Sequence, residues 1–495
     1  MECMSRCRPL NPDRRTEDAM RYTIHRNSVA FLACVLLTGC MVGPNYKKPI
    51  APVPPTFTGA STTSANSTDQ NPIAYTDWWK VFHDPVLNDL ESQADAANRD
   101  IKIAVAHVDE AAATTKATRS QLFPFVGTDV SALRAREAQN RPNNGNTSGR
   151  AATYNDIQLP LVASYEIDAW GRVRRSIESS RATQEATEAD LRFVTLSVEA
   201  GVAVNYYNLR ETDQELTILD STIETLKKSL ELTTNLFHHG LSSELEVKQS
   251  QTLLDQTISQ KQALEIQRAQ LEHGLAVLLG RTAEGFSLPK SPNDAVPPQI
   301  PIGLPADLLE RRPDIVEADR NVAAATAQIG VAKAAYFPQL SLTGLVGYES
   351  TNATSLLNWQ NTIASLGASA AAPIFTGGRL KAGVEQAQAT YRQSLAQYEK
   401  TVLVSYQETE DQLSALHFLQ EQSQSQGSAV LEATEAQNIA ISRYKGGLVS
   451  YLDVVFAEQT VLANERTAAQ IAGERMVASV VLIKTLGGGW NGTTQ

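Results

Sequence analysis

The chain has 495 residues, of which 42% are hydrophobic and 20% are charged, a composition that predicts a folded protein rather than a disordered one. Only 6% of the residues are aromatic, while alanine, glutamine and serine are abundant, which favours long helices packed through small side chains. The formal net charge of −11 argues against a nucleic-acid partner, because phosphate binding needs a basic surface.

The cysteines are confined to the beginning of the chain, at Cys3, Cys7, Cys34 and Cys40. The main body can therefore hold neither a disulfide nor a cysteine metal site. Arg21 and Arg26 precede an apolar run over residues 29–37, which is too short to cross a bilayer and is typical of a secretory signal.

The run ends in Leu37-Thr38-Gly39-Cys40, which resembles the lipobox of bacterial lipoproteins. We therefore predict that residues 1–39 are a signal peptide and that Cys40 becomes the lipidated first residue, carrying acyl chains such as palmitate. The alternative is an ordinary cleaved signal with an incidental cysteine. Met20 is a better candidate for the true start than Met1. Residues 40–75 are rich in proline, serine and threonine and read as an extended tether.

The rest of the chain divides into two similar halves, predicted at 76–280 and 313–487, with a proline-rich linker over 281–312 and a tail over 488–495. In each half an alanine-rich helix ends before a Phe-Pro pair, Phe123-Pro124 or Phe337-Pro338. Matching positions lie 214 residues apart in these first helices and 207 apart later. The first half should therefore contain seven additional residues, for which the polar stretch 137–150 is the candidate.

After each Phe-Pro pair the hydrophobic pattern changes from helical to alternating. Four strands of about ten residues are expected within 125–133, 157–167, 340–348 and 366–374, apolar on one face and long enough for a membrane β-strand. Four strands cannot close a barrel, and an open edge cannot be left in lipid. Three chains giving twelve strands are the simplest solution, and a soluble four-stranded sheet packed on helices is the alternative.

Helices of about 65 residues are expected after Gly171 and Gly378. In the first, leucine and isoleucine recur every seven residues from Leu209, as in a coiled coil, whereas the matching positions from Leu416 are more polar. At 1.5 Å per residue each helix would approach 100 Å, so it must project into an aqueous compartment.

Each long helix ends at a glycine turn from which a second helix returns. The two predicted turns contain the following residues: Gly240, Leu241 and Ser243 in the first half, and Gly447, Leu448 and Ser450 in the second. Ser243 and Ser450 are the expected N-caps, with Glu246 and Asp453 three residues later as capping-box acids.

Together these features resemble the TolC-like outer-membrane efflux factors, in particular the lipoprotein branch that includes the NodT family. The resemblance covers residues 37–490 and is carried by the lipobox with residues 42–49, Trp78-Trp79, Asp84-Pro85, residues 304–315, both Phe-Pro pairs and both glycine turns.

The resemblance implies a mainly α-helical chain with a transmembrane β part. The expected assembly is a homotrimer with a twelve-stranded barrel in the lipid of the outer membrane, continued by a long α-helical barrel in the periplasm. It also implies docking to a periplasmic adaptor and an inner-membrane pump, usually of the resistance-nodulation-division class. The chain would then be a passive exit duct rather than an enzyme, with no cofactor. A periplasmic coiled-coil lipoprotein with a structural or adaptor role is the alternative function.

In this family the periplasmic end is closed by the helix turns. Asp453 matches the first gate aspartate, but Phe456 stands where a second acid is common. Glu246 is the repeat equivalent of Asp453, and Arg443 and Tyr444 could link neighbouring turns. For both acids helix capping alone is the alternative. His238 and His239 read as a solvated pair rather than a metal site, since adjacent helical residues point in different directions.

Overall fold

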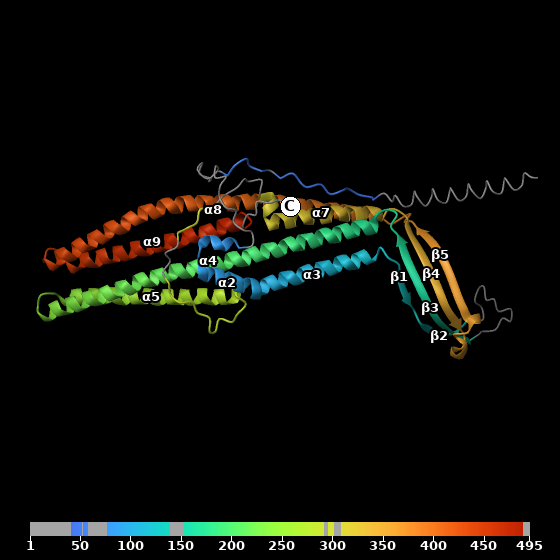
Figure 1. Ribbon diagram of the computed structural model, residues 1–495, viewed down its shortest axis with the longest axis horizontal. Helices are drawn as coiled ribbons and strands as arrows, with labels where there is room; N and C mark the ends of the chain where they lie inside the picture. Colours follow the sequence, from blue (N-terminus) through green and yellow to red (C-terminus); the bar gives the residue numbers. More distant parts are fainter. Residues whose placement is uncertain are drawn as a thin grey trace, which may run out of the picture. The chain divides into compact units, whose positions relative to one another are not determined.

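The computed structural model describes residues 41–51, 53–57, 77–138, 153–291, 296–300 and 308–488. The predicted signal peptide, Cys40, most of the tether and most of the stretch 137–150 lie outside these ranges. The chain forms two compact units, and each takes segments from both halves (Figure 1). The strand unit takes the described residues within 41–47, 111–184 and 321–394, and the helical unit takes those within 48–110, 185–320 and 395–488.

Corresponding helices in the two halves have equal lengths. Helices α3 (Arg99–Ser120) and α7 (Pro313–Ala334) have 22 residues each. Helices α4 (Arg172–His238) and α8 (Arg379–Lys445) have 67 each, close to the predicted 65, and α5 (Glu244–Leu278) and α9 (Tyr451–Thr485) have 35 each. The seven additional residues of the first half therefore lie between the start of the first strand and the start of α4.

The strand unit contains one antiparallel sheet in the order β1-β3-β4-β5, with β2 also paired to β3. Its strands are β1 (Phe125–Thr128), β2 (Ser131–Arg136), β3 (Thr153–Ile167), β4 (Gln339–Ser350) and β5 (Thr362–Ala371). Strand β5 forms one edge of the sheet, and β1 and β2, which each pair with β3, together form the other. The last predicted strand was placed too late, because β5 ends before Ile374.

The prediction of one continuous first strand was wrong, since β1 and β2 are separated at residues 129 and 130. Both pair with β3, and the break lies opposite Pro160 and Leu159 in the register. The Pro160 carbonyl accepts a hydrogen bond from Thr128 Oγ1 at 2.7 Å, so this residue faces β1. Because proline has no N–H, it cannot complete the ladder there.

The first residues after the predicted lipidation site are fixed onto helices of the strand unit. The almost fully buried Arg175 of α4 donates hydrogen bonds to Val42 O, Gly43 O and Asn45 Oδ1 at 3.3, 3.4 and 2.8 Å. Gly43 has φ +103°, and a Cβ there would lie 2.5 Å from Gly330 Cα on α7. Only glycine at both positions allows this close crossing, so this part of the tether is packed rather than free.

In the helical unit the predicted seven-residue seam of α4 is buried along most of its length. Leu209, Leu216, Leu219 and Leu226 are each at most 1% exposed, but Phe237 near the end of the helix is 39% exposed. The matching positions on α8 are only half-buried, as their polar character predicts.

Shorter elements cover one end of the helical unit. A 3₁₀ turn, η1 (Trp78–Phe82), precedes α2 (Pro85–Ala97), whose first N–H groups donate to the Asp84 carboxylate. The buried Glu199 of α4 accepts a hydrogen bond from Trp78 Nε1 at 2.8 Å. Burial of its carboxyl group raises the pKa of Glu199 to about 8.

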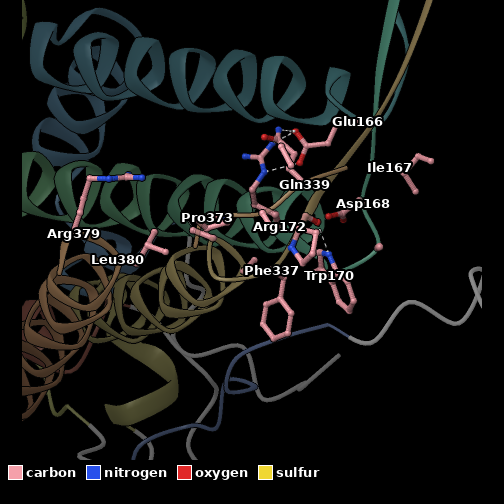
Figure 2. A pocket seen from close by; sticks show the side chains of 16 residues that line it. Glu166, Ile167, Asp168, Trp170, Arg172, Phe337, Gln339, Pro373, Arg379 and Leu380 are labelled. Atoms are coloured by element: carbon pink, nitrogen blue, oxygen red, sulfur yellow. Dashed lines mark hydrogen bonds and ion pairs between the residues drawn. The ribbon is translucent and has the colours of Figure 1, made fainter. Parts of the chain in front are cut away.

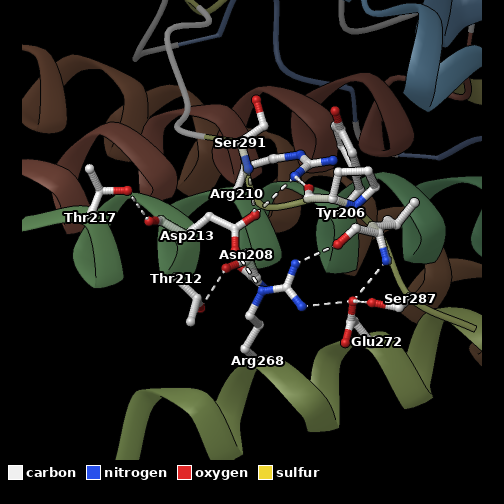
Figure 3. Close-up of polar contacts among 12 residues, drawn as sticks. Tyr206, Asn208, Arg210, Thr212, Asp213, Thr217, Arg268, Glu272, Ser287 and Ser291 are labelled. Carbon is white, nitrogen blue, oxygen red and sulfur yellow. Dashed lines mark hydrogen bonds and ion pairs between the residues drawn. The ribbon is translucent and has the colours of Figure 1, made fainter. Parts of the chain in front are cut away.

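A buried charge network fixes the start of the linker (Figure 3). Asp213 pairs with Arg210 at 2.9 Å and with Arg268 at 2.7 Å, and Arg268 also pairs with Glu272 at 2.8 Å. The network also binds linker backbone: Arg268 donates to Leu288 O and Arg210 to Pro289 O, while Glu272 accepts from Leu288 N and Asp213 from Ser291 N. In the described residues of the linker the regular element is the short helix α6 (Leu308–Arg311), and the first part of the linker is held in place by this network.

Candidate functional site

The two glycine turns of the helical unit have the same backbone geometry. Gly240 and Gly447 both have φ +71°. In each turn the glycine N–H and the following leucine N–H bond to carbonyls of the preceding helix at 2.8–2.9 Å, which is a Schellman ending. The predicted turn positions are confirmed, and the φ value explains why glycine is required there.

The two capping acids do different things, although they are equivalent in sequence. Asp453 Oδ2 accepts hydrogen bonds from the backbone N–H and the hydroxyl of Ser450 at 3.0 and 2.7 Å, so it caps its own helix as predicted.

The capping-box role predicted for Glu246 is wrong. Its Oε2 accepts hydrogen bonds from Ser242 Oγ at 2.7 Å and from Tyr444 OH at 2.8 Å. The Ser243 hydroxyl alone caps α5, accepting from Glu246 N at 3.4 Å. Glutamate is one methylene longer than aspartate, which lets this carboxylate reach the other half of the chain.

The helices on either side of each glycine turn form a hairpin, α4–α5 in the first half and α8–α9 in the second. The Tyr444–Glu246 bond joins the two hairpins, since Tyr444 is on α8 and Glu246 is on α5. The Tyr444 ring also packs against Tyr451 of α9, with centroids 5.4 Å apart, and Tyr451 OH lies 3.0 Å from Ser229 Oγ on α4. Burial, followed by the Glu246 carboxylate, raises the pKa of Tyr444 to about 12. The phenol therefore keeps its proton at physiological pH and donates the bond.

The repeat does not supply a second link of this kind. The first-half equivalent of Tyr444 is Phe237, which has no hydroxyl, and Asp453 is committed to its own cap. Two hydrogen bonds therefore join the hairpins near the turns, Tyr444–Glu246 and Tyr451–Ser229, and of these two only Tyr444–Glu246 involves a charged group.

An apolar cluster with buried side chains from α4, α5 and α9 supports this link, and partly buried residues of α8, including Tyr444, pack against it. Its buried members are Ile223, Leu226, Leu253, Leu254, Tyr451, Val454 and Val455. Glu458 lies one turn further along α9 and is 5% exposed, with Oε2 lacking a hydrogen-bond partner among the described residues. Burial raises the pKa of Glu458 to about 7. Sequence reasoning missed this residue, although its spacing from Val454 and Val455 could have revealed it.

The other predicted turn residues are exposed. Leu241 and Leu448 are each 76% exposed, and Phe456 is 71% exposed. The Arg443 side chain is exposed and forms no hydrogen bond or ion pair with a residue that the structure describes. These side chains are therefore available to partners outside the chain.

The described residues contain no cluster of three or more His, Cys, Asp or Glu side chains that could hold a metal ion. Among the helices within the described ranges, none is long and apolar enough to cross a membrane.

The sequence pattern of the outer membrane efflux protein family matches residues 90–281 and 304–488. The chain belongs to this family. Its two matched segments each contain one of the glycine turns, so both hairpins are family features. The chain is an outer-membrane efflux channel, and channels of this family are homotrimers that work with periplasmic adaptors and inner-membrane pumps.

Individual relatives match over nearly their whole length. The cation efflux system protein CusC of Escherichia coli O6:H1 (strain CFT073) is 30% identical over 461 residues, covering 93% of this chain and 98% of CusC. The solvent efflux pump outer membrane protein SrpC of Pseudomonas putida is 31% identical over 468 residues, covering 94% and 98%. The solved structure of the outer-membrane channel OprN matches with a TM-score of 0.83 and 32% identity, over 91% of this chain and 100% of that one. Of the two functions that the sequence left open, the comparisons support the duct.

Proposed function

We propose that the chain forms a passive exit duct whose inner end is closed by its helix turns, with the Tyr444–Glu246 bond as the latch within each protomer. The observation that carries this proposal is the hydrogen bond from Tyr444 to the Glu246 carboxylate, which joins the two hairpins at the turns. Opening the duct would separate the hairpins, so this bond and the tyrosine contact beneath it would break.

Asp453 and Phe456 are the proposed constriction residues. Asp453 uses only Oδ2 in its cap, and its Oδ1 accepts no hydrogen bond from a described residue, so the carboxylate can face the lumen while it caps. In a trimer three such carboxylates would form a ring that favours cations. The exposed Phe456 would narrow the next level along α9.

The exposed leucines Leu241 and Leu448 are the proposed contacts of the adaptor. They lie at the turns, where an exposed apolar side chain has no packing role in its own chain. The exposed Arg443 is a candidate link to a neighbouring turn or to the adaptor.

The strand unit is proposed to supply four of twelve barrel strands, with β1 and β2 together counting as one. Cys40 is proposed to carry the lipid. The duct performs no chemistry in this scheme, and the pump supplies the energy. The relatives are named for cations and for solvents, a range that a non-selective duct would accommodate.

Purified protein in planar bilayers tests the gate. Asp453→Asn should reduce cation selectivity, while Glu246→Ala should raise the open probability without changing selectivity. If both variants conduct like the wild type while their thermal stability falls, the two acids serve only the fold. Loss of lipid labelling in Cys40→Ala, with retention in Cys34→Ala, would support the anchor.

A further inference from the structure

Two equivalent turns connect strands to long helices in the strand unit. The first strand turn (residues 168–171) lies between β3 and α4, and the second strand turn (residues 372–378) lies between β5 and α8. At the offset of 207, Asp168 corresponds to Phe375 and Trp170 corresponds to Gly377. The chemistry of the two turns has therefore diverged.

The first strand turn is covered by the Phe-Pro pair that precedes β4. Trp170 stacks on Phe337 with ring centroids 4.9 Å apart, and its Nε1 donates to Pro338 O at 2.7 Å. Asp168 caps α4 by accepting from Val173 N and Arg174 N at 3.0 Å. The Phe-Pro pair of the second half thus packs on a turn of the first half.

Polar and charged side chains around the first strand turn form hydrogen bonds with one another (Figure 2). Glu166 accepts from Arg172 Nε and Nη2 at 2.8 and 2.7 Å, and from Gln339 Nε2 at 2.9 Å. A cavity of about 660 Å³ lies between these residues and the second strand turn, lined also by Trp170 and Pro373. Because the Glu166 carboxylate and the Arg172 guanidinium in the cavity wall are already paired with each other, we assign the cavity no ligand.

No described residue covers the second strand turn in this way. Ile374 is 100% exposed and Phe375 is 91% exposed. Strand β5, which leads into this turn, is an edge of the sheet. Two large apolar side chains at a sheet edge without a partner indicate a contact with another chain.

The opposite edge carries a Phe-Pro pair that is also exposed. Phe123 of this pair is 67% exposed, and Phe125, the first residue of β1, is 70% exposed. Phe123-Pro124 precedes β1 as Phe337-Pro338 precedes β4, at the offset of 214. Within the chain, the strand after the second pair bonds to β3, and the pair itself covers the turn that follows β3.

We propose that Phe123-Pro124 of one protomer packs on Ile374 and Phe375 of the next, repeating between chains the contact made within the chain by Phe337-Pro338. The occupant is a second copy of this chain, because the same repeat already makes the contact once internally. Gly377 leaves no indole for Phe123 to stack on, and Phe375 supplies the ring instead. The inference rests on the proposed trimer, which would contain three such contacts.

Disulfide crosslinking tests the contact, since Cys40 is the only cysteine after the predicted signal peptide. Full-length chains carrying Phe123→Cys with one tag and Phe375→Cys with another are coexpressed and oxidised in membranes. We expect a covalent dimer containing both tags. The control pairs Phe123→Cys with Phe456→Cys. Phe456 is 71% exposed, so its cysteine is also accessible, but this pair should give no mixed dimer. Absence of the mixed dimer, or an equal yield from the control, overturns the contact.

A second measurement follows the assembly itself. Phe375→Asp should lower the fraction of detergent-resistant trimer at least tenfold, whereas Phe418→Asp, at a 63% exposed position on α8, should leave it unchanged. If the wild-type chain forms trimers but Phe375→Asp does not weaken them, the contact is wrong and the trimer stands. If chemical crosslinking of the wild type gives no trimer, the proposed assembly itself fails.

Discussion

Tyr444→Phe should shift the channel towards its open state. The substitution removes the hydroxyl that donates to Glu246 at 2.8 Å and leaves the ring that packs on Tyr451. A hydrogen bond to a charged group contributes about 1.5–3 kcal/mol, and both side chains are half-buried, so the lower end, about 1.5 kcal/mol per protomer, applies. At 1.4 kcal/mol per factor of ten, the open-to-closed ratio should rise roughly tenfold if protomers open singly and roughly 1,000-fold if three open together.

Open probability in planar bilayers measures this shift. The matched control is Tyr206→Phe, which removes a tyrosine hydroxyl bonded to the Asp84 carboxylate at 2.6 Å and belongs to no turn. It should lower thermal stability while conductance stays unchanged. If Tyr444→Phe leaves the open probability at the wild-type level, or if Tyr206→Phe raises it equally, the latch is refuted. Glu246→Ala should add little to Tyr444→Phe, because both remove the same bond.

Three further predictions concern stability. Asp213→Ala should lower the free energy of unfolding by about 3–5 kcal/mol in urea titrations, since it leaves the buried Arg210 without its carboxylate partner and Arg268 paired with Glu272 alone. Asp220→Ala, at a half-exposed pair with Lys261, should cost about 1 kcal/mol or less, and equal losses would contradict the role of burial. Glu458 has a pKa raised from 4.5 to about 7, so the folded state binds more protons than the unfolded chain between these values, and this group makes stability fall as pH rises from about 4.5 to 7. Glu458→Gln should make the fall of the melting temperature across that range less steep, since Glu199 still contributes to it, and an unchanged slope would refute the contribution of Glu458. Gly43→Ala should expose the first residues of the tether to protease, because Gly43 has a positive φ and the added Cβ would clash with the Gly330 backbone. Gly427→Ala is the control: it lies on an open helix face and should raise the free energy of unfolding by up to about 1 kcal/mol.

The sequence predicted those features that depend on local chemistry. Glycine at Gly240 and Gly447 is required by a left-handed backbone, and proline ends the helices before Phe-Pro, so both signals can be read within a few residues. The periodicity of hydrophobic residues predicted the lengths of the long helices to within about two residues. The C-terminal end of β5 was predicted too late, because Ile374 keeps the alternating pattern although the strand has already ended at Ala371.

Features that depend on distant partners could not be read in this way. The capping-box pattern is the same at Glu246 and Asp453, and only the position of Tyr444, 198 residues from Glu246, separates their roles. The interruption of the first strand is caused by Pro160 on its neighbour, not by the interrupted segment. The spacing of Glu458 from Val454 and Val455 places it on a buried helix face, but the absence of a described hydrogen-bond partner for its Oε2 depends on the other helices packed there.

The equal lengths of paired helices restrict how this chain can change during evolution. A heptad inserted into α4 alone would carry the first turn past the second, and Glu246 would no longer meet Tyr444. Four helices, α4, α5, α8 and α9, would have to lengthen by the same amount for the latch to survive. Single insertions in these segments should therefore be eliminated, and family members of different reach should differ by matched insertions at corresponding places in both halves.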